Sequence, residues 1–189
     1  MPLPRIEGYA IVSSDGMLAN AQGVMPPELV FEADQNFFHG ALEQADALVH
    51  GRHSHERYPP TGHKPRLIAT RSITALEHDN ENANAWLWNP SGASIEDACA
   101  ALKIAGGTLG VIGGTDIFGL FLPLYDTFHL SHAPSVTLPG GRPVFPQVPA
   151  LSADEVLKRS GLAVKKTRVL DPSANITLST WEPENRTAR

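Results

Sequence analysis

Short apolar segments that end in polar or turn-forming residues constrain the fold of this chain more than any other feature. They include residues 6–12, 45–49, 66–70 and 108–112. Each is too short for a stable helix and apolar enough to be covered on both faces, as strands of a parallel sheet are. Helical patterns separate several of these segments. The alternation predicts an α/β fold in three layers, with a central, mostly parallel sheet flanked by helices.

Three segments have helical spacing. Apolar residues recur from about residue 28 to 43, and residues 115–121 form a short helical run before a proline. In residues 94–105, Ser94 can cap the first turn, and Cys99 falls on the apolar face. The single cysteine is therefore predicted to be a small buried side chain rather than a nucleophile.

The C-terminal part of the chain predicts antiparallel strands. Residues 127–132 form a strand, and a Pro/Gly-rich loop at 134–149 follows. Residues 163–170 and 175–181 then read as a hairpin, which makes the sheet mixed. The strand at 163–170 could pair within the sheet or across a homodimer, so the oligomeric state stays open. All 189 residues are expected to form one domain.

Composition excludes several classes of protein. The formal net charge of -5 argues against binding to nucleic acid or to a membrane surface, because both need a basic excess. One cysteine permits no intrachain disulfide, which favours a reducing compartment. The first residues do not resemble a signal peptide, and no segment is long enough to span a bilayer. A cytoplasmic protein that acts on a small molecule is expected.

A glycine pair between a strand and a helix is the strongest local motif. Gly113 and Gly114 follow the apolar run at 108–112 and precede the helix at 115–121. Glycine lets the backbone approach a ligand closely, and a helix start offers free N–H groups to phosphate. A tight turn without a ligand explains the pattern equally well. The chain has neither a G-x-G-x-x-G motif nor a P-loop, so a dinucleotide site of the usual Rossmann type is unsupported.

A second polar set follows the next apolar strand. Arg52, His53 and Ser54 come after residues 45–49, and Arg71 follows the strand at 66–70. Arginine, a hydroxyl and a helix start together suit phosphate, and parallel strands place such groups at one edge of the sheet. The competing metal interpretation is weaker because His53 and His55, two residues apart, would point to different sides of a helix. It would use His50, His53, His55 and Glu56.

Asp34 interrupts an apolar helical face. Phe31, Phe37 and Phe38 surround it in the sequence. A carboxyl group among aromatic side chains can have a raised pKa and take part in proton transfer. On the pattern alone, an ordinary solvated acid on the helix surface is the simpler explanation.

Together these motifs resemble the dihydrofolate reductase family, over residues 6–146 of the chain. The glycine-pair segment at 111–118, followed by residues 121–123 and 130–132, is similar to the family's glycine-pair segment and the strand after it. Residues 51–56 resemble its cofactor-binding turn, and Met25 with Pro26 the end of its mobile loop. The resemblance implies a mostly parallel sheet ending in antiparallel strands, with NADPH bound across the carboxyl edge.

The resemblance also implies roles for individual residues. The glycine pair is expected to be joined by a cis peptide. Asp34 would bind the amino-pyrimidine edge of the substrate and help protonate its ring nitrogen, as the catalytic residue. The substrate pocket would be completed by Ser131, Phe31, Phe38 and Ile112. The cofactor would be held by Ala10, Ile11, Leu18, Gly51, Arg52, His53, Ser54, Arg71, Ile112, Gly113, Gly114, Thr115, Asp116 and Ile117.

Two positions differ from the family pattern. Pro27 stands where the family has tryptophan, and His63 and Lys64 stand where it has the arginine that clamps the glutamate tail of folate. The turn at residues 13–16 instead resembles the related riboflavin-pathway reductase domain, which reduces a ribosylamino-pyrimidine with NADPH. The expected activity is NADPH-dependent hydride transfer to a C=N bond of a pterin such as dihydrofolate. The ribosylamino-pyrimidine, and a nucleotide-binding protein without catalysis, remain alternatives.

Overall fold

A computed structural model describes residues 3–52, 62–104 and 106–185. Within these residues a nine-stranded sheet has the strand order β10-β11-β8-β1-β7-β3-β4-β6-β5. A separate antiparallel pair joins β2 and β9. The strands are β1 (Arg5–Ser13), β2 (Met17–Ala19), β3 (Ala47–Gly51), β4 (Arg66–Ala69), β5 (Leu76–His78), β6 (Ala85–Trp88), β7 (Thr108–Val111), β8 (Thr127–Ala133), β9 (Arg142–Pro143), β10 (Leu162–Asp171) and β11 (Ile176–Pro183).

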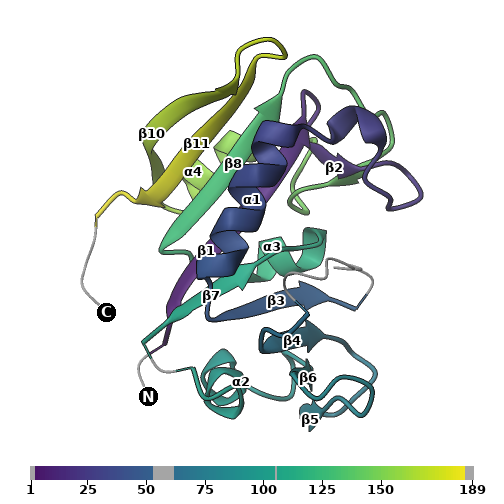
Figure 1. The fold of residues 1–189 in the computed structure, drawn as a ribbon, viewed down its shortest axis with the longest axis vertical. Coiled ribbons are helices and arrows are strands. Elements are labelled where there is room, and N and C mark those ends of the chain that lie inside the picture. Colours follow the sequence, from purple (N-terminus) through teal and green to yellow (C-terminus); the bar gives the residue numbers. More distant parts are fainter. Residues whose placement is uncertain (1–2, 53–61, 105, 186–189) are drawn as a thin grey trace.

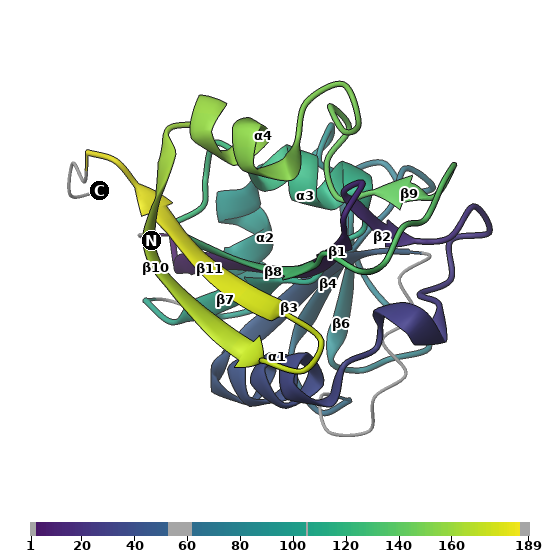
Figure 2. The ribbon, with the colours of Figure 1, turned by 90° about the horizontal axis from the view of Figure 1, so that it is seen from above.

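Helices cover both faces of the sheet (Figures 1 and 2). Seen from above, α1 lies on one face, and α2, α3 and α4 lie on the other. The three-layer arrangement expected from the sequence is confirmed. The helices are α1 (Glu32–Gln44), α2 (Ile95–Ala101), α3 (Thr115–Phe121) and α4 (Ala153–Arg159), with a 3-10 turn, η1, at Pro27–Leu29.

The strand pairing brings several of the residues predicted to form a site to one edge of the sheet. β1 pairs in parallel with β7 and β8, and β3 with β7 and β4, so their carboxyl ends lie at the same edge. β11 pairs antiparallel with β8 and β10, which confirms the C-terminal hairpin and the mixed sheet. The strand at β10 therefore pairs within the sheet.

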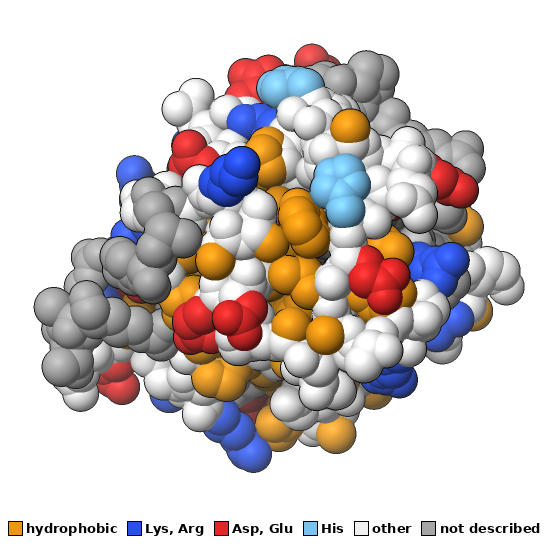
Figure 3. All heavy atoms as spheres, turned by 90° about the horizontal axis from the view of Figure 1, so that it is seen from below, with side chains coloured by type: hydrophobic (Ala, Val, Ile, Leu, Met, Phe, Trp, Pro, Cys, Tyr) orange, Lys and Arg blue, Asp and Glu red, His pale blue; other side chains and the backbone are white. Residues whose placement is uncertain are grey.

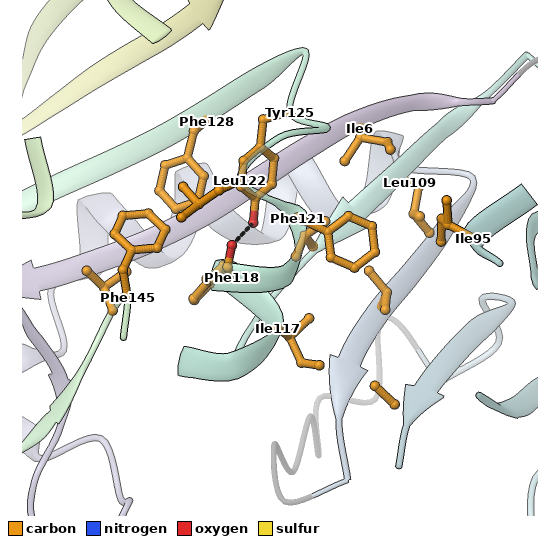
Figure 4. Close-up of a cluster of buried hydrophobic side chains, with 14 of the residues drawn as sticks. Ile6, Ile95, Leu109, Ile117, Phe118, Phe121, Leu122, Tyr125, Phe128 and Phe145 are labelled. Carbon is orange, nitrogen blue, oxygen red and sulfur yellow. Dashed lines mark hydrogen bonds between the residues drawn. The ribbon is translucent and has the colours of Figure 1, made fainter. Parts of the chain in front are cut away.

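An aromatic core fixes α3 against the sheet (Figure 4). Phe121 and Phe128 are fully buried, and Phe118 packs edge-on against Phe128 with 5.6 Å between ring centroids. The hydroxyl of Tyr125 donates a hydrogen bond of 3.3 Å to the carbonyl of Phe118. Burying such rings is among the largest favourable contributions that a small core can make. This packing holds the start of α3 at the carboxyl edge.

The expected helix at residues 28–43 is wrong at its beginning. Pro27–Leu29 forms the 3-10 turn instead, Phe31 is extended, and α1 starts at Glu32. Proline suits the first position of a helical turn, which explains why a separate turn forms there. Ala45 belongs to the end of α1, since its N–H binds the carbonyl of Ala41, and β3 starts two residues later.

Other elements depart from the sequence expectation in smaller ways. α2 ends at Ala101, before Lys103 adopts a positive φ of 57°. The expected loop at 134–149 contains β9, and β2, β5 and α4 were not anticipated. The start of α4 has a capping box between Ser152 and Glu155, a signal present in the sequence. Cys99 is buried, and burial followed by the charge of Glu96 raises the pKa of its thiol to about 11, which agrees with an unreactive core residue.

The face at the β5 end of the molecule shows hydrophobic side chains between scattered charged ones (Figure 3). Leu76 on β5 and Trp86 and Leu87 on β6 are half-buried. No helix within the described residues combines the length and the apolar character needed to cross a membrane.

Candidate active site

A cavity of about 260 Å³ opens between α1 and the carboxyl half of β1 and β8. Its walls are mostly apolar and aromatic, with a few polar groups, the usual composition of a small-molecule site. The lining residues are Tyr9, Ala10, Ile11, Leu18, Ala19, Gly23, Met25, Asp34, Gln35, Phe37, Phe38, Ile112, Gly114, Phe118, His129 and Ser131.

Asp34 is the buried acid of this cavity. It lies in the first turn of α1, is 5% exposed, and forms a hydrogen bond with Ser131. Burial raises the pKa of its carboxyl group, and the hydrogen bond with Ser131 only partly opposes this. The position of Ser131 in the sheet explains its contact with Asp34. Ser131 on β8 pairs with Ile11 on β1, and both side chains lie on the face of the sheet that α1 covers. The interpretation of Asp34 as a solvated surface acid is therefore wrong.

The predicted substrate residues divide into two groups. Ser131, Phe38 and Ile112 line the cavity with Asp34. Phe31 precedes α1 and packs against the buried cluster that contains Ile11 and Leu29, so the structure does not bring it to the cavity wall. The late start of α1 is the physical reason, since Phe31 lies outside the helix that presents Asp34.

The glycine pair lies at the carboxyl end of β7. The expected cis peptide between Gly113 and Gly114 is present. Gly113 has a φ of 98°, and a Cβ atom there would lie 2.7 Å from Cε2 of Phe118. Its carbonyl accepts a hydrogen bond of 2.8 Å from the N–H of Gly51, which joins the ends of β7 and β3. Gly114 lines the cavity, where a missing side chain leaves space for a ligand.

Residues on β1, β2 and α3 surround this glycine pair. Ala10, Ile11 and Leu18, the residues expected near a nicotinamide ring, line the same cavity as Gly114. The hydroxyl of Thr115 donates to the carbonyl of Pro143, so it anchors β9. Ile117 is buried in the core, which leaves only its backbone for a ligand contact.

Two arginines lie at the outer end of the same edge. Arg52 follows β3 and donates a hydrogen bond of 2.9 Å to the hydroxyl of Ser72. Arg71 follows β4, and its highly exposed guanidinium lies 3.9 Å from the carboxylate of Asp116. A surface pair of this kind contributes little to stability, so Arg71 remains available for another anion. Ser72 was not anticipated, although it follows Arg71 at the end of a strand.

Part of the predicted phosphate set cannot be placed. His53 and Ser54, with the His55 and Glu56 of the metal alternative, lie outside the described residues. Within the residues that are described, no three His, Cys, Asp or Glu side chains gather in a way that could hold a metal ion.

A charged and aromatic cluster borders the inner end of the cavity and was not anticipated. Tyr9 and His129 face each other on β1 and β8, and their rings stack in parallel with centroids 5.2 Å apart. The hydroxyl of Tyr9 donates to Glu7 over 2.6 Å. Contact with His129, then hydrogen bonds from Tyr9 and Arg5, lower the pKa of Glu7 to about 2, although burial opposes this. The sequence did carry a signal for this cluster. His129 and Tyr9 precede Ser131 and Ile11 by two residues, and residues two apart on a strand face the same side of the sheet.

Comparisons by sequence give no match to a protein-family model and none to a curated protein. Comparison with solved structures gives several. A protein assigned to riboflavin biosynthesis from Shewanella sp. PV-4 is 20% identical with a TM-score of 0.65, and the match covers 96% of this chain and 99% of that one. Dihydrofolate reductase from Enterococcus faecalis, in a complex with NADP(H), is 17% identical with a TM-score of 0.66, over 96% and 97%.

A third similar structure is a two-activity protein from Thermotoga maritima. It is a diaminohydroxyphosphoribosylaminopyrimidine deaminase and 5-amino-6-(5-phosphoribosylamino)uracil reductase. It is 16% identical with a TM-score of 0.63, and the match covers 95% of this chain but 56% of that one. Identities this low establish architecture rather than activity. The chain has the dihydrofolate reductase-like fold that these three proteins share.

Proposed function

We propose that this protein is an NADPH-dependent reductase that transfers hydride to a C=N bond of a pterin or pyrimidine ring. The observation that carries the proposal is Asp34, a buried acid with a raised pKa in a cavity beside the glycine pair. A carboxyl group of this kind supplies a proton to a ring nitrogen as the neighbouring carbon is reduced. Similar solved structures include a dihydrofolate reductase and a riboflavin-pathway reductase, which supports the reaction class.

The residues present at the carboxyl edge fit NADPH. Arg52 and Arg71 offer two guanidinium groups to the anionic end of the cofactor. Gly114 presents backbone without a side chain to the cavity, and the apolar side chains of Ala10 and Leu18 suit a nicotinamide ring. When bound, NADPH supplies the hydride, which is chemistry that no side chain can provide.

The chain's own contribution is positioning and proton supply. The carboxyl group of Asp34 accepts hydrogen bonds from an amino-pyrimidine edge when ionised and donates a proton when neutral. The hydrogen bond with Ser131 fixes its direction. Phe38 provides a flat aromatic surface and Ile112 an aliphatic one, and together they hold a planar ring and exclude water from the reacting bond.

The ribosylamino-pyrimidine is the second candidate substrate, and the turn after β1 favours it. Residues 13–16 resemble the corresponding turn of the riboflavin-pathway domain. The hydroxyl of Ser13 donates to Asp15, and Asp15 accepts from the N–H of Leu138, so the turn is firmly held at the end of β1. Pro27 in place of tryptophan and Lys64 in place of arginine also remove two folate-specific features. The ammonium of Lys64 instead binds the carbonyls of Glu43 and Ala45.

The test is the oxidation of NADPH by purified protein with each candidate substrate in turn, beginning with dihydrofolate. We expect turnover with one of them, and a loss of 10²- to 10⁴-fold, the usual order of magnitude for a proton donor, in Asp34→Asn. Glu32→Gln is the matched control, because Glu32 is an exposed acid in the same helical turn. NADPH binding without turnover on any substrate would favour a nucleotide-binding protein that has no catalytic role.

A further inference from the structure

The polar side chains that line the cavity differ in whether a protein group already takes up their hydrogen bonds. The hydroxyl of Tyr9 donates to Glu7 over 2.6 Å, and Nδ1 of His129 lies 3.3 Å from the hydroxyl oxygen of Thr180. Ser131 forms a hydrogen bond with the buried acid of α1. These three side chains shape the inner part of the cavity, but their polar atoms are already paired within the protein.

Gln35 is the exception among the polar residues of the wall. It lines the cavity from near the start of α1, and its backbone N–H donates a hydrogen bond of 2.9 Å to the carbonyl of Phe31. Its side-chain amide forms no hydrogen bond with any other residue that the structure describes. A primary amide has two N–H donors and a carbonyl acceptor. The wall therefore presents hydrogen-bonding groups that a ligand can use.

Helical geometry places this amide at one side of the buried face of α1. Successive residues of a helix are about 100° apart around its axis, so the side chains follow one another in the order Phe37, Asp34, Phe38, Gln35. Phe37 is turned toward β8, because its ring packs edge-on against His129 with 5.3 Å between centroids. Gln35 lies at the opposite end of this series, and therefore on the side of the acid that faces away from β8.

Asp34 and Gln35 also differ in depth. The side chain of Asp34 is 5% exposed, whereas Gln35 is half-buried. A ring whose nitrogen meets the carboxyl group of Asp34 lies inside the cavity. The Cα atoms of the two residues are adjacent in the chain and about 3.8 Å apart, so the amide of Gln35 is within reach of a group attached to that ring. Gln35 is thus placed to meet a substituent that extends from the ring toward the opening.

The hydrogen-bonding character of the amide selects among possible substituents. A hydroxyl group both donates and accepts, so it can pair with either end of an amide. An aromatic ring in the same place would bury the amide without a partner, which weakens binding. The described residues that line the cavity include no lysine or arginine, so this wall offers neither cation to a carboxylate tail. These properties suit a substituent built from hydroxylated carbons, such as a sugar.

We propose that Gln35 is a substrate-binding residue that selects a ring with a hydroxylated, sugar-like substituent, through a hydrogen bond between its amide and a hydroxyl group. The identity of the ring and its reduction rest on the proposed function, whereas the preference for hydroxyl groups does not require turnover. The inference favours the ribosylamino-pyrimidine over dihydrofolate, because the first group beyond the ring is a sugar in one and an arylamine in the other.

The first experiment measures binding to two pairs of compounds by calorimetry. One pair is a diaminouracil with and without a ribosyl group on an amino nitrogen. The other is a dihydropterin that carries a trihydroxypropyl or a methyl group at the same carbon. We expect the wild type to bind the hydroxylated member of at least one pair more tightly. In Gln35→Leu that preference should fall about 3- to 10-fold, the order of magnitude for one neutral hydrogen bond.

The controls separate this hydrogen bond from a general effect on the helix. Gln44→Leu makes the same substitution at the exposed end of α1 and should keep the wild-type preference. The affinity of Gln35→Leu for the member without hydroxyl groups should match that of the wild type. The proposal is overturned if the wild type binds none of the four compounds, if it shows no preference within either pair, or if Gln35→Leu retains the full preference.

The second experiment follows NADPH oxidation with the same compounds. Because Gln35 meets the substituent rather than the reacting bond, its loss should appear as a higher KM for the hydroxylated substrate. Asp34→Asn, in contrast, should lower kcat. A hydroxyl preference that disappears in Gln35→Leu, together with no oxidation of NADPH by any compound, would support the binding role and contradict the proposed reductase function alone.

Discussion

At the scale of single residues, the proposed role of Asp34 comes with a cost in stability. Its carboxyl group shares the cavity wall with Phe37, Phe38 and Ile112. Two causes act on its pKa, namely burial, which raises it, and a hydrogen bond with Ser131, which lowers it. Ionising a buried acid is unfavourable, and burial accordingly raises its pKa. Stability given up at one position for chemistry is a common property of active sites.

This cost predicts that Asp34→Asn is more stable than the wild type at neutral pH. The unfolded chain ionises Asp34 at a lower pH than the folded chain does, so wild-type stability falls as the pH rises from the unfolded pKa through the raised folded pKa. Below both values the two proteins should have the same Tm, and above both the variant's Tm should be higher by a few degrees. Thermal unfolding at acidic and neutral pH, with Glu32→Gln as the control, measures the difference. Equal Tm values at neutral pH would show that the carboxylate carries no such cost.

Individual residues also show how far sequence reasoning reaches into the site. The order of the motifs along the chain was enough to predict that Asp34, Ser131 and the glycine pair share one site. Each of these residues occupies a fixed position at a strand or a helix, so a local motif identifies it. Glu7 and His129 were missed because their meaning comes from strand pairing between segments more than 100 positions apart. No local pattern determines which strands become neighbours, so contacts of this kind require the assembled sheet.

At the scale of elements, the ends of the longer helices and strands were harder to predict than their presence. The helix at α3 agrees with the sequence expectation residue for residue. α1 begins later than expected, because Pro27 starts a separate turn and the chain then extends through Phe31. β2 and β9 have only three and two residues, and the periodicity of such short strands is too brief to recognise.

At the junction between β7 and α3, we expect the addition of a single methyl group at Gly113 to lower the stability of the protein. In Gly113→Ala the new Cβ would meet the buried Phe118 ring at 2.7 Å, and alanine is strained at a φ of 98°. We expect a loss of about 1–3 kcal/mol in the free energy of unfolding, measured in urea. Gly40→Ala is the control, because Gly40 lies within α1 with nothing within 4 Å, and it should gain about 0.5–1 kcal/mol. A Gly113→Ala protein with the wild-type urea midpoint would contradict the crowding.

At the scale of the whole molecule, an acidic chain presents a local basic edge. The net charge is -5, yet Arg52 and Arg71 lie together at the carboxyl ends of β3 and β4. The overall charge does not favour the general binding of polyanions, whereas two arginines at one edge suit a single small anion.

This charge distribution predicts the response of the molecule to the proposed cofactor, NADPH. A ligand that binds only the folded state adds about 2.7 kcal/mol at a concentration of 100 times its Kd. NADPH should therefore raise Tm, and NADH at the same concentration should raise it less, because it lacks the additional phosphate. Arg71→Gln should reduce the difference between the two nucleotides. Arg159→Gln, an exposed arginine on α4, should preserve it. Equal responses of the wild type to NADPH and NADH would remove the phosphate role from Arg71.

The strand order also has a consequence for biosynthesis. β11 lies between β8 and β10 although it follows both in the chain. Before β11 has been synthesised, β8 can pair with β1 along one edge, but its other edge is unpaired. β10 has no partner strand in the sheet at that stage. The nascent polypeptide must therefore hold an open β-edge, a site for adhesion to other chains, until β11 has emerged. A translational pause before β11 would lengthen the period in which chaperones are needed.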